Sequence, residues 1–69
     1  MKYKIYSKLT KAQDLCYDAK ENNLFDMCQY HFDILDDQEL TKRDLEKILK
    51  FASDVCKIAK LKINLNSLI

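Results

Sequence analysis

Four residues of this chain have side chains that could bind a metal ion or act as nucleophile and base. They are Cys16, Cys28, His31 and Cys56. Thiolate and imidazole groups are the ligands that zinc prefers, and Cys28 and His31 would share one face of a helix because they are three positions apart. A closed site of three cysteines and one histidine would also stabilise a domain this small.

The spacing of these residues argues against a metal site or a catalytic pair. Structural zinc sites usually contain a close pair of cysteines, and the sequence has none. A nucleophilic thiol needs solvent access, but Cys28 and His31 lie on an apolar stripe that should face the core. We therefore expect packed, reduced thiols around a hydrogen-bonded histidine, no metal or other cofactor, and no enzymatic activity.

Three segments with helical periodicity must position these residues. In the first segment, apolar residues at spacings of four and three share one face of a helix. Either Ser7 or Thr10 would cap this helix, since Thr10 and Gln13 have the form of a capping box, and the helix should end near residues 21–23. The residues on its apolar face are Ile5, Leu9, Ala12, Cys16 and Ala19.

The second segment, from about residue 23 to residue 37, has a broad apolar surface. Its central stripe contains Leu24, Cys28, His31 and Leu35, with further apolar residues on both sides. The resulting arc covers about half of the helix circumference, which is more than a surface helix needs. This width predicts that the second helix is the central and most buried one.

The third segment has the clearest start signal. Thr41 and Asp44 match a capping box, and Leu40 and Leu45 occupy the positions of a hydrophobic staple. The helix should run from residue 42 to about residue 61, and residues 62–69 would extend it, dock as a loop or pair as a strand with residues 3–5. The sequence thus predicts one all-α domain over residues 1–69, a compact three-helix bundle with or without an ordered C-terminal tail, in which Leu35 and Leu45 are core residues.

Composition and charge exclude several functions. The 69 residues include no Gly and no Pro, which excludes glycine-rich phosphate loops and proline-rich ligands. The net charge of +1 hides a segregation, because residues 12–40 carry −7 while the flanking segments each carry +4. No stretch has the form of a signal peptide or a membrane span, so we expect a cytoplasmic protein without membrane contact. The bias toward Phe, Tyr, Met, Ile, Asn and Lys is typical of AT-rich genomes, which are common in phages, mobile elements and some low-GC bacteria.

Two rows of residues are candidates for partner binding. An apolar row with a spacing of seven lies on the third segment, and its surplus of apolar surface favours self-association or contact with another protein. A row of carboxylates on the first two segments could orient a basic partner or take the place of phosphates. Alternatively, the tail covers the apolar row and the acids form an ordinary solvated face. The apolar row is Phe51, Ile58 and Leu65; the acidic row is Asp14, Asp18, Asp26 and Asp33.

These features favour a small non-enzymatic protein-binding module. Its partner would be another protein with a basic surface, or a second copy of the chain in a homodimer. The most concrete hypothesis is a phage- or mobile-element-encoded inhibitor that occludes a host defence or nucleic-acid-processing protein. The alternatives are an antitoxin-like or regulatory partner protein and a small helix-turn-helix-like DNA-binding regulator. Direct nucleic-acid binding is disfavoured because the chain has a single Arg and is not basic as a whole.

Overall fold

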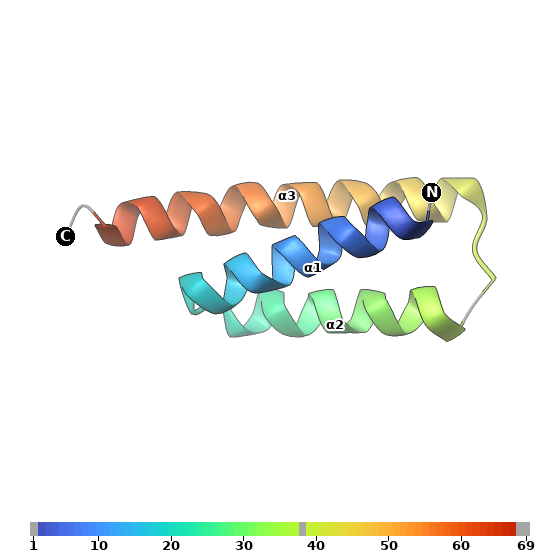
Figure 1. The fold of residues 1–69 in the computed structure, drawn as a ribbon, viewed down its shortest axis with the longest axis horizontal. Helices are drawn as coiled ribbons and strands as arrows, with labels where there is room; N and C mark the ends of the chain where they lie inside the picture. The colour runs from blue at the N-terminus through green and yellow to red at the C-terminus, as the bar shows by residue number, and fades with distance from the viewer. Residues whose placement is uncertain (1, 38, 68–69) are drawn as a thin grey trace.

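The computed structural model describes residues 2–37 and 39–67, which form three helices and no strand (Figure 1). These are α1 (Lys2–Ala19), α2 (Asn22–Asp37) and α3 (Lys42–Ser67). The chain runs up, down and up, so α1 and α3 are parallel and α2 is antiparallel to both (Figure 1). The predicted all-α three-helix bundle is confirmed, and it is elongated, with principal extents of 44 × 16 × 15 Å.

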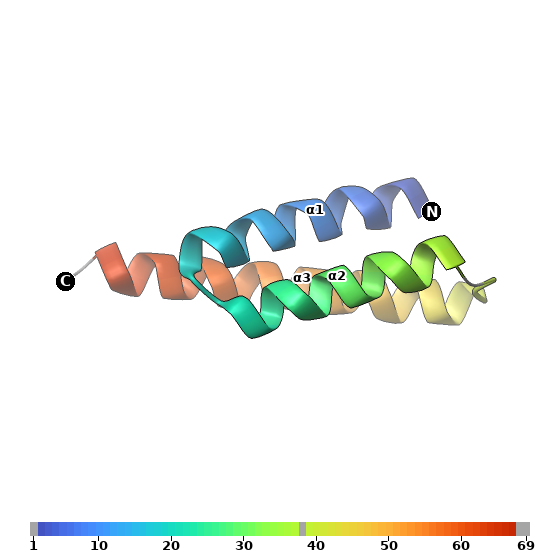
Figure 2. The ribbon, with the colours of Figure 1, turned by 90° about the horizontal axis from the view of Figure 1, so that it is seen from below.

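The central helix is α1, so the prediction that the second helix would be central was wrong. α1 packs extensively against α3 and also against α2, whereas α2 and α3 meet in only a few places. Figure 2 shows α1 lying on one side of the pair formed by α2 and α3. All five residues of the predicted α1 stripe are buried, whereas over residues 22–36 of α2 the buried residues are Cys28 and Leu35. The broad apolar arc of α2 is therefore covered only in part.

The core follows α1 and is built partly from small side chains. Ala12, Ala52 and Ala59 are fully buried, and side chains of this size allow helix axes to approach closely. Leu35 is fully buried, which confirms its predicted place in the core, whereas Leu45 is partly buried and packs against the edge of the core. Each large side chain that is removed from water here contributes about 1.5–3 kcal/mol to folding.

The start of α1 differs from the sequence prediction. The helix begins at Lys2, so Ser7 and Thr10 lie inside it and neither residue is its cap. The Thr10 hydroxyl instead donates a hydrogen bond to the carbonyl oxygen of Tyr6 at 2.8 Å. Serine and threonine commonly bond in this way to the preceding turn when they lie within a helix, so the capping-box pattern at Thr10 was misleading.

The end of α1 is closed by a left-handed residue, although the chain contains no glycine to supply it. Lys20 has φ of 59°. Its N–H donates to the carbonyl oxygen of Tyr17 at 3.2 Å, and the N–H of Glu21 donates to that of Cys16 at 2.9 Å. These two bonds form a Schellman motif, a position where glycine is usual because a Cβ atom makes the left-handed conformation unfavourable.

The capping box at the start of α3 is confirmed. The backbone N–H of Thr41 donates to Asp44 Oδ2, and the N–H of Asp44 donates to Thr41 Oγ1, both at 3.2 Å. The carbonyl oxygen of Thr41 accepts the first helical bond, from the N–H of Leu45, at 3.1 Å. The hydrogen bonds from Thr41 hold the pKa of the Asp44 carboxyl below its usual value.

The C-terminal segment extends α3. The helix continues to Ser67, so residues 62–67 form neither a loop nor a strand, and residues 68–69 lie outside the described part of the chain. A helix of 26 residues is about 39 Å long, against about 24 Å for α2, so the last turns of α3 project beyond the other two helices (Figure 1). An ion pair between Lys62 and Glu21 marks where the projection begins. None of the described helices has a segment long and apolar enough to cross a bilayer.

Candidate functional site

The three cysteines are placed in the core, away from the histidine. Cys16, Cys28 and Cys56 are buried free thiols. Burial raises the pKa of Cys16 and raises that of Cys28 to about 12, with the neighbouring Cys16 adding to the rise at Cys28. Among the described residues, no group of three or more Cys, His, Asp or Glu is arranged so that it could hold a metal ion. Protonated thiols without solvent access are poor nucleophiles and poor metal ligands.

His31 lies between α2 and α3 instead of in the core. The ring stacks on Phe51 of α3, with centroids 4.2 Å apart and planes at 16°, and meets Tyr30 edge-on at 5.7 Å. Its Nδ1 lies 2.7 Å from the carbonyl oxygen of Met27. Because a carbonyl oxygen can only accept, Nδ1 carries the proton of this bond. The prediction of a hydrogen-bonded histidine holds, but its place among the thiols was wrong: His31 is partly exposed and forms one of the few contacts between α2 and α3.

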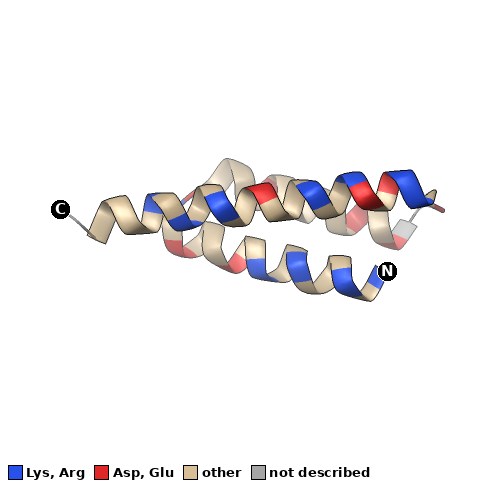
Figure 3. Cartoon of the chain, turned by 90° about the horizontal axis from the view of Figure 1, so that it is seen from above, with Lys and Arg blue, Asp and Glu red and all other residues tan. Residues whose placement is uncertain are grey.

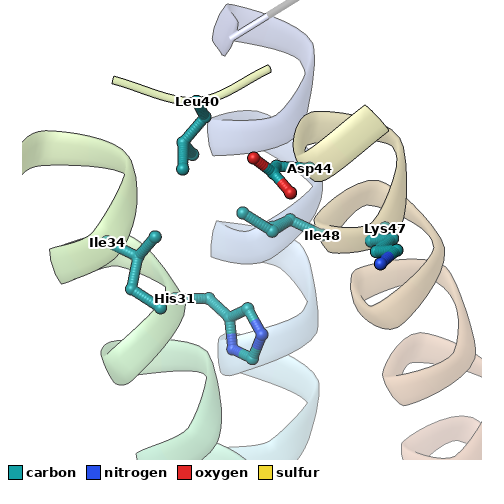
Figure 4. Close-up of a pocket in the computed structure, with 6 residues that line it drawn as sticks. All are labelled: His31, Ile34, Leu40, Asp44, Lys47 and Ile48. Atoms are coloured by element: carbon teal, nitrogen blue, oxygen red, sulfur yellow. The ribbon is translucent and has the colours of Figure 1, made fainter. Parts of the chain in front are cut away.

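A pocket of about 280 Å³ opens next to this histidine (Figure 4). The close-up shows α2 and α3 on its two sides and α1 passing behind it. One carboxylate oxygen of Asp44 is already engaged by the helix cap. Ile34, Leu40 and Ile48 form an apolar part of the remaining wall, beside the polar side chains of His31 and Lys47. Its lining residues are His31, Ile34, Leu40, Asp44, Lys47 and Ile48.

The pocket is one end of a larger surface, which we call the α2–α3 face. Asp44 lines the pocket, and the predicted apolar row Phe51, Ile58 and Leu65 follows it at intervals of seven, so these residues lie along the same side of α3. Ile34 of α2 also lines the pocket, and Met27 precedes it by seven. Exposed fractions are 46% for Met27, 42% for Ile58 and 60% for Leu65. The α2–α3 face thus consists of Met27, His31, Ile34, Phe51, Ile58 and Leu65, with the pocket at one end.

The contribution of α2 to this face was missed by the sequence prediction. Met27 and Ile34 were assigned to a buried arc, but Met27 is exposed and Ile34 is partly exposed. The sequence did contain a sign of this exposed surface. The apolar arc of α2 covers about half of the helix circumference, and one neighbouring helix, α1, cannot cover an arc that wide. Phe51 is itself partly buried by its contact with His31, so Ile58 and Leu65 are the more accessible members of the predicted row.

The predicted acidic row is divided between two helices. Asp14 and Asp18 lie on α1, Asp26 and Asp33 lie on α2, and all four are exposed. Since α1 does not contribute to the α2–α3 face, the four carboxylates do not form one row beside the apolar residues. Asp26 and Asp33 belong to a helix that borders this face.

The charges of α2 and α3 are opposite and largely unpaired within the molecule. α2 has four aspartates and no basic residue, whereas α3 has seven basic and three acidic residues. Figure 3 shows the basic residues along α3 and along the first half of α1. Among the side chains that the structure describes, the one ion pair is that of Lys62 with Glu21. Most of these charges are exposed to solvent.

The relative orientation of α2 and α3 can be compared with that of the two helices in a helix-turn-helix motif. The two helices run antiparallel beside each other (Figure 1), whereas the helices of a helix-turn-helix motif cross steeply. The pair therefore lacks the geometry of that DNA-binding motif. No family model matches this chain, and comparisons with curated proteins and with solved structures find no match.

Proposed function

We propose that this chain is a small protein-binding module that docks a helix of another polypeptide on its α2–α3 face. The observation that carries this proposal is the one-sided covering of α2 and α3. α1 packs on one side of the pair, while the other side keeps an open pocket and exposed Met27, Ile58 and Leu65. An amphipathic helix that lays its apolar side on such a surface is a common mode of peptide recognition.

The total surface supports the need for a partner. A compact monomer of 8.2 kDa exposes about 4,500 Å². This chain exposes 5128 Å², an excess of roughly 600 Å². A standard protein interface covers about 800 Å² on each partner. The elongated shape, 44 × 16 × 15 Å, contributes to this excess, as do the exposed apolar side chains of the α2–α3 face.

We further propose that the module inhibits a host defence or nucleic-acid-processing protein in the cytoplasm, and that a phage or mobile element encodes it. Three unpaired thiols suit a reducing compartment, and the residue bias of the sequence suits such an origin. The exposed aspartates of α1 and α2 suit a partner with a basic surface. An antitoxin-like or regulatory partner would use the same face, and the identity of the captured protein distinguishes these roles.

Catalysis is not part of the proposal. The thiols are buried, and the ring of His31 is engaged by Met27 and Phe51. The stacking on Phe51 gives the histidine a structural role in holding α2 and α3 together.

Capture of partners from the cells that produce this chain tests the proposal. A tagged wild-type chain is compared with Ile58→Asp and with Tyr17→Asp, a control whose side chain is 76% exposed on α1. We expect wild type and Tyr17→Asp to retain the same protein and Ile58→Asp to lose it, because the substitution places a charge in the apolar contact. Retention by all three chains, or by none, would contradict the proposed face. Circular dichroism checks that each variant is folded.

A further inference from the structure

We infer that this chain also binds the phosphate backbone of a double-stranded nucleic acid, through a surface on the side of α1 and α3 that faces away from α2. We call this surface the α1–α3 basic face. The inference goes beyond the proposed function, because it concerns a different ligand and a different surface. The face contains three lysines of α1 and four of α3, which are Lys4, Lys8, Lys11, Lys42, Lys50, Lys57 and Lys60.

A contact with α2 fixes how α1 is turned about its axis. Tyr6 stacks on Phe32 of α2, with ring centroids 5.9 Å apart. Because a helix turns by about 100° per residue, Lys4, Lys8 and Lys11 lie between about 140° and 160° around α1 from Tyr6, on the side away from α2. Lys4 and Lys11 are exposed, whereas Lys8 is partly buried. Since α2 is on the other side, the helix that covers Lys8 is α3.

The orientation of α3 is fixed in the same way. Phe51 stacks on His31 of α2, so this ring marks the side of α3 that is turned toward α2. The four lysines of the face lie between about 100° and 180° around α3 from Phe51, on the outward side of the helix. All four are exposed. The lysines of α1 and those of α3 therefore line the same side of the molecule.

The tertiary structure joins two basic segments that are far apart in the sequence. The net charge of +1 disfavoured nucleic-acid binding, but that sum includes the aspartates of α2, which lie elsewhere on the molecule. α1 and α3 are parallel and pack extensively against each other. Figure 3 shows their basic residues side by side, with α2 behind α3. Glu46 and Asp18 are the acids on this side of the two helices, so the seven lysines leave five net positive charges.

The composition of the face favours nucleic acid over protein as its ligand. Among the exposed apolar side chains that the structure describes, Leu61 alone borders the basic face, whereas Met27, Ile58 and Leu65 belong to the α2–α3 face. Protein interfaces depend on a few buried apolar, aromatic or arginine anchors, but a phosphate backbone is bound by positive charge. Lysine ammonium groups act as point charges and lack the planar fork that reads a base edge, so we expect binding without sequence preference.

The positions of the tyrosines favour a duplex over a single strand. Proteins that bind single strands stack the bases on aromatic side chains. Tyr3 and Tyr17 are exposed, but both lie within about 60° of Tyr6 around α1 and so on the side of α2. The lysines of α3 extend over about 27 Å from Lys42 to Lys60. That length is most of one turn of a duplex, which is about 34 Å.

Fluorescence anisotropy with labelled duplexes of DNA and of RNA tests the inference. If about five lysines each contact a phosphate, the affinity for the DNA duplex should fall roughly 500-fold between about 50 and 200 mM salt. Salt-sensitive binding of either duplex supports the inference, and the tighter of the two identifies the source of the backbone. Absence of binding to both, or tighter binding to a single strand of the same length or to polyglutamate, would overturn it.

Two double variants test whether both helices contribute to the face. Lys4→Ala with Lys11→Ala changes α1, and Lys50→Ala with Lys57→Ala changes α3. Alanine favours the helix, so the fold should be retained. Each pair should reduce the slope of log affinity against log salt concentration by about 2 and weaken binding roughly 10- to 100-fold at about 0.1 M salt. Circular dichroism checks that each variant is folded.

A matched control removes the same charge from another side of α3. Lys47 lines the pocket and Lys62 pairs with Glu21, so both lie toward α2. Lys47→Ala with Lys62→Ala should leave the salt slope unchanged. A control that lowers the slope as much, or a slope that responds to the α3 pair and not to the α1 pair, would show that α1 and α3 do not form the face together and would overturn the inference. Loss of partner capture by Ile58→Asp concerns the other face, so the two proposals fail separately.

Discussion

The two sides of the α2–α3 pair show how side-chain size decides whether a helical surface is closed or left open. On the side of α1, Ala12, Ala52 and Ala59 are buried completely, and the helices pack closely. On the other side, the rings of His31 and Phe51 stack between α2 and α3. Beside these rings the pocket stays open. The closed side contains fully buried core residues, and the open side leaves Met27, Ile58 and Leu65 exposed.

The largest expected difference between the two sides is in the cost of truncation. Leu9→Ala removes a fully buried side chain from the closed side and should lower the free energy of unfolding by roughly 2–5 kcal/mol. Ile58→Ala, on the open side, should cost about 1 kcal/mol or less, because the isoleucine is 42% exposed. Urea denaturation at concentrations where the chain is monomeric measures both. Equal losses would mean that the open side is part of the core.

High pH should weaken the closed side selectively. Burial raises the pKa of Cys28 from about 9 in an exposed thiol to about 12 in the folded protein. The contribution of this group to stability is therefore complete below pH 9 and is lost as the pH rises toward 12, because the unfolded chain releases the proton first. Denaturant midpoints between pH 7 and pH 11 measure the loss. Cys28→Ser, whose hydroxyl does not ionise in this range, should show a smaller change above pH 9.

A smaller effect is expected at the border of the open side, where α3 begins. Thr41→Ala removes the hydroxyl that accepts the N–H of Asp44 and should destabilise the protein by about 1 kcal/mol. The loss should be greater than that for Ser67→Ala, whose hydroxyl bonds only within the projecting end of α3. Thermal unfolding followed by circular dichroism compares the two variants. A larger loss for Thr41→Ala than for Leu9→Ala would show that the start of α3, and not the α1 side, limits stability.

The smallest effect is a gain in stability at the turn that joins α1 to α2. Lys20→Gly relieves the left-handed conformation of a residue with a Cβ atom. We expect a gain of roughly 0.5 kcal/mol, since part of the relief is offset by the greater freedom of glycine in the unfolded chain. Lys11→Gly, inside the same helix, should instead cost about 1 kcal/mol. Chemical denaturation of the two variants shows whether each gains or loses stability. A lower free energy of unfolding for Lys20→Gly would mean that the lysine side chain makes a stabilising contact.

Local sequence motifs predicted the start of a helix correctly only where no second motif nearby pointed to a different start. The capping box of Thr41 and Asp44 predicted the first residue of α3, because its two hydrogen bonds are made within one turn. The similar pattern at Thr10 failed, because an apolar face that begins at Ile5 extends α1 beyond it. α1 ends at Ala19, close to the predicted end near residues 21–23, but the left-handed residue Lys20 that closes it was not predicted, since no glycine marks that position.

The sequence by itself determined the amount of apolar surface on each helix and its direction around the axis, because a period of 3.6 residues fixes both. It placed Leu35 in the core and Phe51, Ile58 and Leu65 on one side of α3. Only the tertiary structure decided which helix covers which side. α2 was expected at the centre for its broad arc, but the narrow stripe of α1 took that place. The physical reason is that the width of an apolar arc sets only the maximum contact area of a helix. The sizes of the facing side chains decide how closely each neighbouring helix can approach.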